Sequence, residues 1–202
     1  MRYPWGIHCG SWVWHVSRLP FVACVHVLGI TSSDVRFAHA WENHLGALRA
    51  GKVRYWCVGP DLAWTKWLGI EGSRSFSSAS SLLDAFTGHI QSTTGPFYVS
   101  IDKDVLAPGE VRTNWDQGVM RLDDLAAALR LLRGRIVASD VCGEVSAYRY
   151  RSRFKRLLSG LDGQPAISAT DIAGWQTQHQ TVNRELLRWF QEAAADPGPP
   201  AT

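Results

Sequence analysis

Short apolar runs rich in β-branched and aromatic residues alternate along this chain with segments whose apolar residues recur at helical spacing. The runs at 21–30, 52–59, 96–102 and 135–144 are typical of strands, and the helical spacing predicts helices over 32–51, 80–90, 122–134 and 181–194. Strands that alternate with amphipathic helices indicate βα units with parallel pairing. We therefore expect an α/β fold of three layers, α/β/α, around a mainly parallel sheet that is covered on both faces.

The length and composition are those of a globular protein. The 202 residues are enough for one sizeable core, and we expect a single domain over 1–194 followed by a disordered tail, 195–202, with the sequence ADPGPPAT. No apolar run has the length of a membrane span, and the N-terminus lacks a signal sequence. The four Cys residues are widely spaced and contain no C-x-x-C pair. They are typical of reduced thiols in a cytoplasmic protein.

Charge and aromatic content narrow the choice of partners. The net charge of +3 is too small to indicate a nucleic-acid-binding protein. The segment YRYRSRFKR (148–156) interleaves aromatic and basic residues, and we favour an exposed helix face over a phosphate-binding stretch. The ten Trp residues indicate an aromatic-rich core or pocket wall. We expect neither nucleic acid nor a membrane as a partner.

Two carboxylates follow directly after the apolar run at 96–102. Asp102 and Asp104 are two positions apart, so an extended chain points both to the same side, roughly 7 Å apart. Ligands of parallel α/β sheets bind beyond the carboxyl ends of the strands, where these residues are expected. Two unpaired carboxylates repel each other, and a divalent cation removes that repulsion. The alternative is structural: Asp102 caps the following turn and Asp104 is solvated.

The surrounding sequence resembles a known family. VSIDKDVLAP (99–108) is similar to the S-x-D-x-D-x-x-D-P signature of the arginase and agmatinase superfamily, the ureohydrolases, and IVASDVCGEVS and GIHCGSW resemble two further segments of that family. The resemblance implies an arginase-like fold in which Asp102 and Asp104 hold a two-manganese centre. It also implies that Glu144 faces a substrate guanidinium group and that His8 moves protons near the substrate.

The chain departs from the family pattern at several points. Ala107 stands where the family has Asp, Gly143 is inserted before Glu144, and Ser146 replaces Asn. The D-x-H-x-D motif and the earlier G-D-H segment, which supply the other metal ligands in the family, do not occur in this sequence. We therefore expect that the chain starts part-way through the domain and is N-terminally truncated.

These observations lead to a functional expectation with two alternatives. The resemblance implies a metal-dependent hydrolase that cleaves a C–N bond of a guanidino- or amide-like small molecule. We expect two Mn²⁺ ions if the domain is complete, or another divalent metal, and impaired activity in a truncated chain. One alternative is a non-catalytic binding or structural member of the superfamily, and the other is a hydrolase that uses Cys9. A homo-oligomer is compatible with the resemblance.

Overall fold

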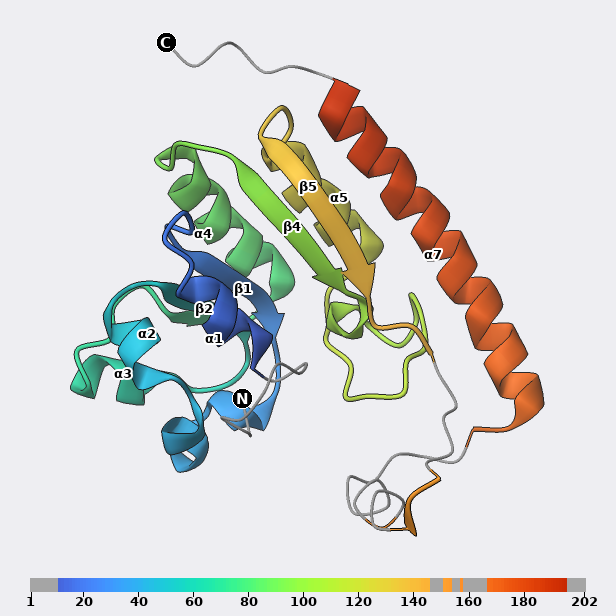
Figure 1. Cartoon of the computed structure of the whole chain (residues 1–202), viewed down its shortest axis with the longest axis horizontal. Coiled ribbons are helices and arrows are strands. Elements are labelled where there is room, and N and C mark those ends of the chain that lie inside the picture. Colours follow the sequence, from blue (N-terminus) through green and yellow to red (C-terminus); the bar gives the residue numbers. More distant parts are fainter. Residues whose placement is uncertain (1–10, 146–150, 154–156, 158–166, 196–202) are drawn as a thin grey trace. The chain divides into compact units, whose positions relative to one another are not determined.

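The computed structural model describes residues 11–145, 151–153, 157 and 167–195. The chain divides into two compact units, Met1–Phe86 (unit 1) and Thr87–Thr202 (unit 2). Each unit contains its own parallel sheet, one of three strands and one of two (Figure 1).

Three parallel strands form the sheet of unit 1 in the order β1-β2-β3. They are β1 (Val25–Ile30), β2 (Val53–Val58) and β3 (Arg74–Phe76), and the short helices of this unit are α1 (Trp12–Ser17), α2 (Leu45–Arg49) and α3 (Ala63–Trp67). The helix α4 (Ala79–Gln91) begins in unit 1 and ends in unit 2. β2 is the central strand and is mostly buried, so its Val53, Tyr55 and Cys57 side chains form the middle of the core.

The segment 32–51 is not the single helix that its spacing predicts. It forms two 3₁₀ turns, η1 (Ser33–Val35) and η2 (Phe37–Glu42), and then α2. The cause is the buried side chain of Asn43, whose amide donates to the carbonyls of Asp34 (3.1 Å) and His39 (3.0 Å). An Asn side chain that binds nearby backbone groups replaces the hydrogen bonds of a helix. Its Oδ1 accepts a hydrogen bond from the Tyr55 hydroxyl at 3.0 Å, which ties the turns to β2.

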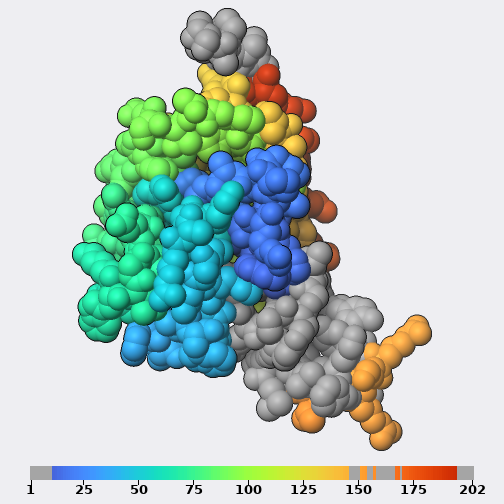
Figure 2. Space-filling view, turned by 60° about the vertical axis from the view of Figure 1, so that its left-hand side comes forward, coloured from blue at the N-terminus to red at the C-terminus, as the bar shows by residue number. Residues whose placement is uncertain are grey.

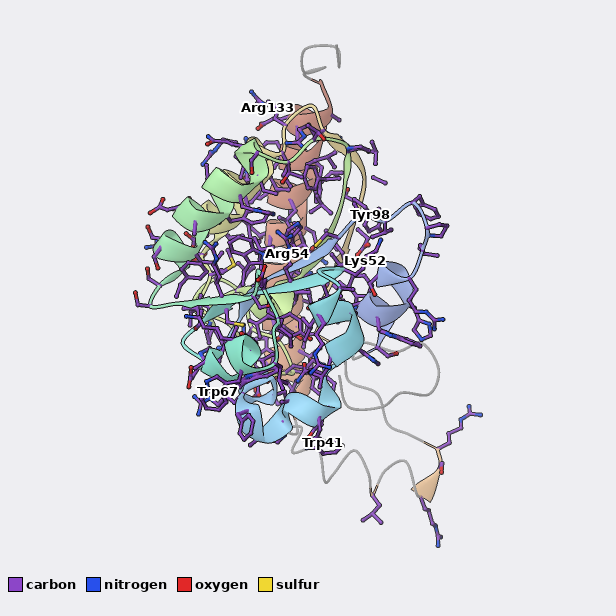
Figure 3. The ribbon with its side chains drawn as sticks, turned by 90° about the vertical axis from the view of Figure 1, so that its left-hand side faces the viewer. Trp41, Lys52, Arg54, Trp67, Tyr98 and Arg133 are labelled. Carbon is purple, nitrogen blue, oxygen red and sulfur yellow. The ribbon has the colours of Figure 1, made fainter. Side chains whose placement is uncertain are left out.

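The tryptophans divide between the interior and the surface. Trp56 and Trp64 are buried, which agrees with the aromatic-rich core that the composition predicts. Trp41 on η2 and Trp67 on α3 are 77% and 76% exposed, and Figure 3 shows both at the surface of unit 1. The segments that carry them are coloured light blue and teal on the face that Figure 2 presents.

The described part of unit 2 contains the parallel strand pair β4–β5 and the helices α5 and α7. β4 (Phe97–Asp102) continues into the 3₁₀ turn η3 (Lys103–Val105), and a loop leads from there to α5 (Leu122–Leu131) and β5 (Ile136–Cys142). β4 and β5 are parallel, and Asp102 lies opposite Cys142 in the ladder. α5 connects the two strands, which makes this a βαβ unit, and α7 packs against β5 and α5 (Figure 1).

Helix α7 (Ala169–Ala195) is much longer than the 181–194 that the periodicity predicts. Its start is fixed by Ser168, whose Oγ accepts a hydrogen bond from the Asp171 backbone N–H at 3.0 Å. The first half of the helix is mainly polar, so it lacks the regular apolar spacing on which the prediction depends. Propensity and capping extend the helix beyond the part that hydrophobic periodicity can detect.

The α/β class and the parallel pairing predicted from the sequence are confirmed. The pairing differs in extent, because the described strands form two small sheets instead of one. The faces of the β4–β5 pair are not fully covered, since Tyr98 and Val137 are 60% and 69% exposed. The single domain over 1–194 stays a prediction, and most of the tail lies outside the described residues. None of the helices in the described part of the chain is long and apolar enough to cross a membrane.

We expect Asn43→Ala to lower the free energy of unfolding by about 1–3 kcal/mol, because it leaves the Tyr55 hydroxyl and two carbonyls without their partner. Chemical denaturation of the full chain measures this loss. Gln91→Ala, which changes an exposed amide side chain, is the control and should have little effect. Equal stability of the two variants would show that Asn43 does not determine the local structure.

Candidate functional site

Polar side chains line one face of the β4–β5 ladder up to its carboxyl end. The Asp140 carboxylate accepts hydrogen bonds from the Ser100 hydroxyl (2.8 Å) and from the Tyr98 hydroxyl, which Figure 3 labels on β4. Asp102 and Cys142 follow on the same face, opposite each other in register. The strand end at which the sequence predicts a ligand site is therefore the end of a continuous row of polar side chains.

Asp102 has the structural role that was one of the two alternatives. Its Oδ1 accepts a hydrogen bond from the Asp104 backbone N–H at 3.2 Å, so Asp102 is the N-cap of η3. The cap uses only one of the acceptor positions of an ionised carboxylate, which has about four. Capping and the binding of a further ligand by Asp102 are therefore compatible.

Asp104 is not the solvated side chain of the structural alternative. Its Oδ1 is buried and has no hydrogen-bond partner among the residues that the structure describes. Burial raises the pKa of the Asp104 carboxyl, and the charges of Asp102 and Asp116 raise it further, whereas a hydrogen bond from Thr113 opposes the rise. Asp104 is thus a partly buried carboxylate whose charge the described residues do not compensate.

Gly143, the residue inserted relative to the family pattern, allows the two strand ends to approach closely. Its φ is +76°, a conformation that residues with a side chain rarely adopt. A Cβ atom at this position would lie 2.4 Å from Asp102 Oδ1 and 2.7 Å from the Lys103 backbone nitrogen. Only glycine permits this contact, which brings Glu144 to the end of β4.

Lys103, between the two aspartates in the sequence, is fully buried. Its ammonium donates hydrogen bonds to Glu144 Oε1 and to Asn183 Oδ1, the latter at 2.9 Å. The Asn183 amide in turn donates to Glu144 Oε1 at 2.8 Å. Lys103 of η3, Glu144 after β5 and Asn183 of α7 form one hydrogen-bonded cluster.

His179, one helical turn before Asn183, completes this cluster. Its side chain is 1% exposed, and Nε2 lies 2.7 Å from the Arg112 carbonyl oxygen. Because a carbonyl only accepts, Nε2 carries the proton, and in the neutral ring Nδ1 has none. Nδ1 lies 3.3 Å from Glu144 Oε2 and has no hydrogen-bond partner among the described residues.

The cluster sets the protonation of both groups. Burial lowers the pKa of His179, and the Lys103 charge lowers it further, against the hydrogen bond to Arg112 and the Glu144 charge. Burial by itself raises the pKa of Glu144, but the hydrogen bonds from Lys103 and Asn183 and the charge of Lys103 leave this pKa below its ordinary value. The result is a neutral imidazole beside an ionised carboxylate and a buried ammonium.

The loop between η3 and α5 is braced by one amide side chain. Gln117 Nε2 donates to the carbonyls of Leu106 (3.2 Å) and Val111 (2.7 Å), and Gln117 Oε1 accepts from the Thr113 backbone N–H at 3.3 Å. Ala107, at the position of the family's third Asp, uses its backbone N–H to bind the Met120 carbonyl at 2.8 Å. This bracing fixes the segment that contains Thr113 and Asp116 beside Asp104.

The structure thus brings Asp102, Asp104 and Glu144 to the same end of the β4–β5 pair. Glu144 differs from the expectation in one respect, because both of its oxygens face residues of this chain. The described residues contain no group of three or more His, Cys, Asp or Glu side chains arranged to hold a metal ion. The two aspartates would supply only part of a metal site.

Several residues singled out in the sequence lie outside the described residues. These are His8, Cys9, Ser146 and most of the segment 148–156, of which only Arg151–Arg153 are described, and their side chains are exposed. Cys142 is described, and burial and the nearby carboxylates of Asp102 and Asp140 raise the pKa of its thiol to about 11. This thiol is therefore protonated at neutral pH and is a poor nucleophile.

Three residues of the cluster were not predicted as functional from the sequence: Lys103, His179 and Asn183. A signal exists for the last two, which are four residues apart and flank Val182 on the buried side of α7. Polar residues on an otherwise apolar helix face indicate buried partners. The partners themselves are distant in the sequence, so the spacing does not identify them.

Comparison with known proteins gives no match. No protein-family model, no curated protein and no solved structure is significantly similar to this chain.

We expect Gly143→Ala to destabilise the protein by roughly 1–2 kcal/mol from backbone strain, with an additional loss from the clash with Asp102. Gly109→Ala is the matched control, because its Cβ would meet nothing within 4 Å and its φ is not positive. Thermal denaturation of both variants tests this expectation. A Gly143→Ala variant as stable as Gly109→Ala would contradict the close approach of the strand ends.

We expect Glu144→Gln to lower the free energy of unfolding at pH 7 by about 1.5–3 kcal/mol, because buried Lys103 loses a charged partner. Since the pKa of Glu144 is lowered on folding, its contribution is present above the unfolded-state value of about 4.3 and is lost as the pH falls through the folded-state value. Denaturation at pH 7 and at pH values below about 4 measures both effects.

Glu192→Gln is the control for this experiment, because Glu192 forms an exposed ion pair with Arg188. Such pairs contribute little to stability, so a change of well under about 1 kcal/mol is expected. A loss of stability in Glu144→Gln that stays constant down to the lowest pH would contradict the ion pair with Lys103.

Proposed function

We propose that this chain is a metal-dependent hydrolase of the ureohydrolase type, with an arginase-like fold, that cleaves a C–N bond of a guanidino- or amide-like small molecule. The observation that carries the proposal is the strand end of β4. There Asp104, near the carboxylate of Asp102, has a buried Oδ1 with no hydrogen-bond partner among the residues that the structure describes. The resemblance of VSIDKDVLAP to the family signature supports the same reading. The free thiols of Cys24, Cys57 and Cys142 are compatible with a cytoplasmic protein.

The donor set at this strand end suits a hard divalent cation. Asp102 at the end of β4 and Asp104 in η3 offer carboxylate oxygens from one short segment, and manganese prefers such ligands. The uncompensated charge of Asp104 is what a cation would neutralise. Because the described residues hold no third ligand, the remaining ligands would come from residues outside them.

A divalent ion bound here would act as a Lewis acid and would lower the pKa of a water molecule. Asp102 and Asp104 would hold the ion, and the hydroxyl of Thr113 would orient the Asp104 carboxylate. Glu144 would accept a hydrogen bond from a substrate nitrogen, since its carboxylate is ionised and half-exposed. His8 would pass a proton to the leaving amine.

A second candidate function is a non-catalytic binding or structural member of the same superfamily. It is favoured by the engagement of both Glu144 oxygens by this chain and by the lack of a three-residue metal group in the described part. Manganese analysis of the purified protein separates the two candidates. Two equivalents of tightly bound metal support the hydrolase, and none supports the binding protein.

We expect Asp104→Asn to abolish manganese binding and to raise the stability of the metal-free protein slightly. The raised pKa of Asp104 means that its ionised form disfavours folding, and stability is lost as the pH rises through the folded-state value. Asn is neutral and removes this cost. Since Asp104 is partly exposed, the gain should not exceed about 1 kcal/mol, or about 2–4 °C in melting temperature.

Asp123→Asn is the matched control, because Asp123 is an exposed carboxylate in the first turn of α5. Calorimetric titration with manganese and melting curves with and without the metal are measured for both variants. The proposal predicts that manganese stabilises the unsubstituted protein and Asp123→Asn but leaves Asp104→Asn unchanged. Equal manganese binding by all three proteins would refute the assignment of Asp104.

A further inference from the structure

The ion pair of Lys103 and Glu144 differs from a surface salt bridge in its burial. The Lys103 side chain is 0% exposed, whereas the Glu144 side chain is 50% exposed. Water cannot replace the carboxylate as the partner of the ammonium, and an uncompensated buried charge is strongly unfavourable. The Glu144 carboxylate therefore stays paired with the Lys103 ammonium, and the net charge of this ion pair is zero.

The hydrogen-bond positions that remain near Glu144 are acceptors. Oε1 receives the donors of Lys103 and Asn183. Oε2 faces His179 Nδ1 at 3.3 Å, and Nδ1 carries no proton because Nε2 donates its own to Arg112. Nδ1 is buried and lies too close to Oε2 for a ligand atom to fit between them, so the half-exposed Glu144 carboxylate is the acceptor that a ligand N–H can reach.

The pair selects between two kinds of N–H donor. A guanidinium group gains its affinity for a carboxylate from a net negative charge, and here the Lys103 ammonium has already neutralised that charge. It would also have to approach a buried cation that cannot move to water. A neutral amide or urea group needs only a hydrogen-bond acceptor, so the charge of Lys103 lowers its affinity little.

The aspartates do not reverse this preference. In the proposed function the charge of Asp102 and Asp104 is compensated by the divalent cation that these two residues would hold. The net charge that a ligand meets at Glu144 is thus set mainly by Lys103 and by the neutral His179.

We propose that Lys103 is a specificity-determining residue, which neutralises Glu144 so that the site accepts a neutral amide- or urea-like group in preference to a guanidinium. This inference rests on the proposed function, because it narrows the substrate class of that site. Asn183 and His179 of α7 are positioning residues in this arrangement, since they hold the carboxylate in one orientation.

The test uses two probes of similar shape, N-methylurea and methylguanidinium chloride, at equal ionic strength. Binding to the full chain is followed by NMR through the side-chain amide of Asn183. The unsubstituted protein should bind N-methylurea at least about tenfold more tightly than methylguanidinium. Lys103→Met, which keeps most of the buried volume, should raise the affinity for methylguanidinium by about 10- to 100-fold, the range expected for one charge-assisted hydrogen bond.

Lys66→Met is the matched control, because Lys66 is an exposed lysine of α3 in unit 1, and its probe affinities should equal those of the unsubstituted protein. Equal affinity of the unsubstituted protein for both probes, or no shift at Asn183 with either one, overturns the assignment. This comparison needs no variant, so it holds even where Lys103→Met fails to fold. An unchanged methylguanidinium affinity in folded Lys103→Met also overturns it.

The outcome can be separated from that of the proposed function. Manganese binding that depends on Asp104 reports on the hydrolase, and the ratio of the two probe affinities reports on Lys103. If manganese binding depends on Asp104 but the two probes bind equally well, only the role of Lys103 is overturned. If the protein prefers N-methylurea but binds no manganese, Glu144 belongs to a binding site for neutral N–H donors, and the protein is not a metal hydrolase.

Discussion

The buried ammonium of Lys103 requires a negative partner, and this requirement joins three separate parts of unit 2. Lys103 belongs to the turn after β4, Glu144 follows β5, and Asn183 lies in the middle of α7. Because the ammonium is shielded from water, loss of Glu144 would leave a charge that the interior cannot stabilise. The position of α7 against the strand pair therefore depends on polar contacts as well as on apolar packing.

This arrangement gives the acidic residues at the strand end different roles. Glu144 is neutralised and oriented by its own chain, whereas Asp104 remains without a compensating partner among the described residues. The glycine at 143 makes the division possible, since any side chain there would collide with Asp102. The carboxylate of Asp104, without a compensating charge among the described residues, thus lies near Glu144, whose charge Lys103 compensates.

Much of the secondary structure could be predicted because local spacing reflects burial. The cores of the strands and the helices α4 and α5 were predicted within a few residues. The prediction of one helix over 32–51 was wrong. The contact that decides this segment joins Asn43 to Tyr55 of β2, and the proximity of these two residues depends on the tertiary fold. The first half of α7 was missed because a polar helix has no hydrophobic period. β3 was missed because its three residues are too few for a pattern.

The sequence by itself determined the α/β class, the parallel pairing and the position of Asp102 and Asp104 at a strand end, because hydrophobic periodicity and the direction of parallel strands are local properties. Only the tertiary structure decided which acids have partners. The partner of Glu144 is 41 residues away along the chain and that of Lys103 on α7 is 80 residues away. Hydrogen bonds and burial between such distant residues arise from packing, and a spacing pattern contains no information about them.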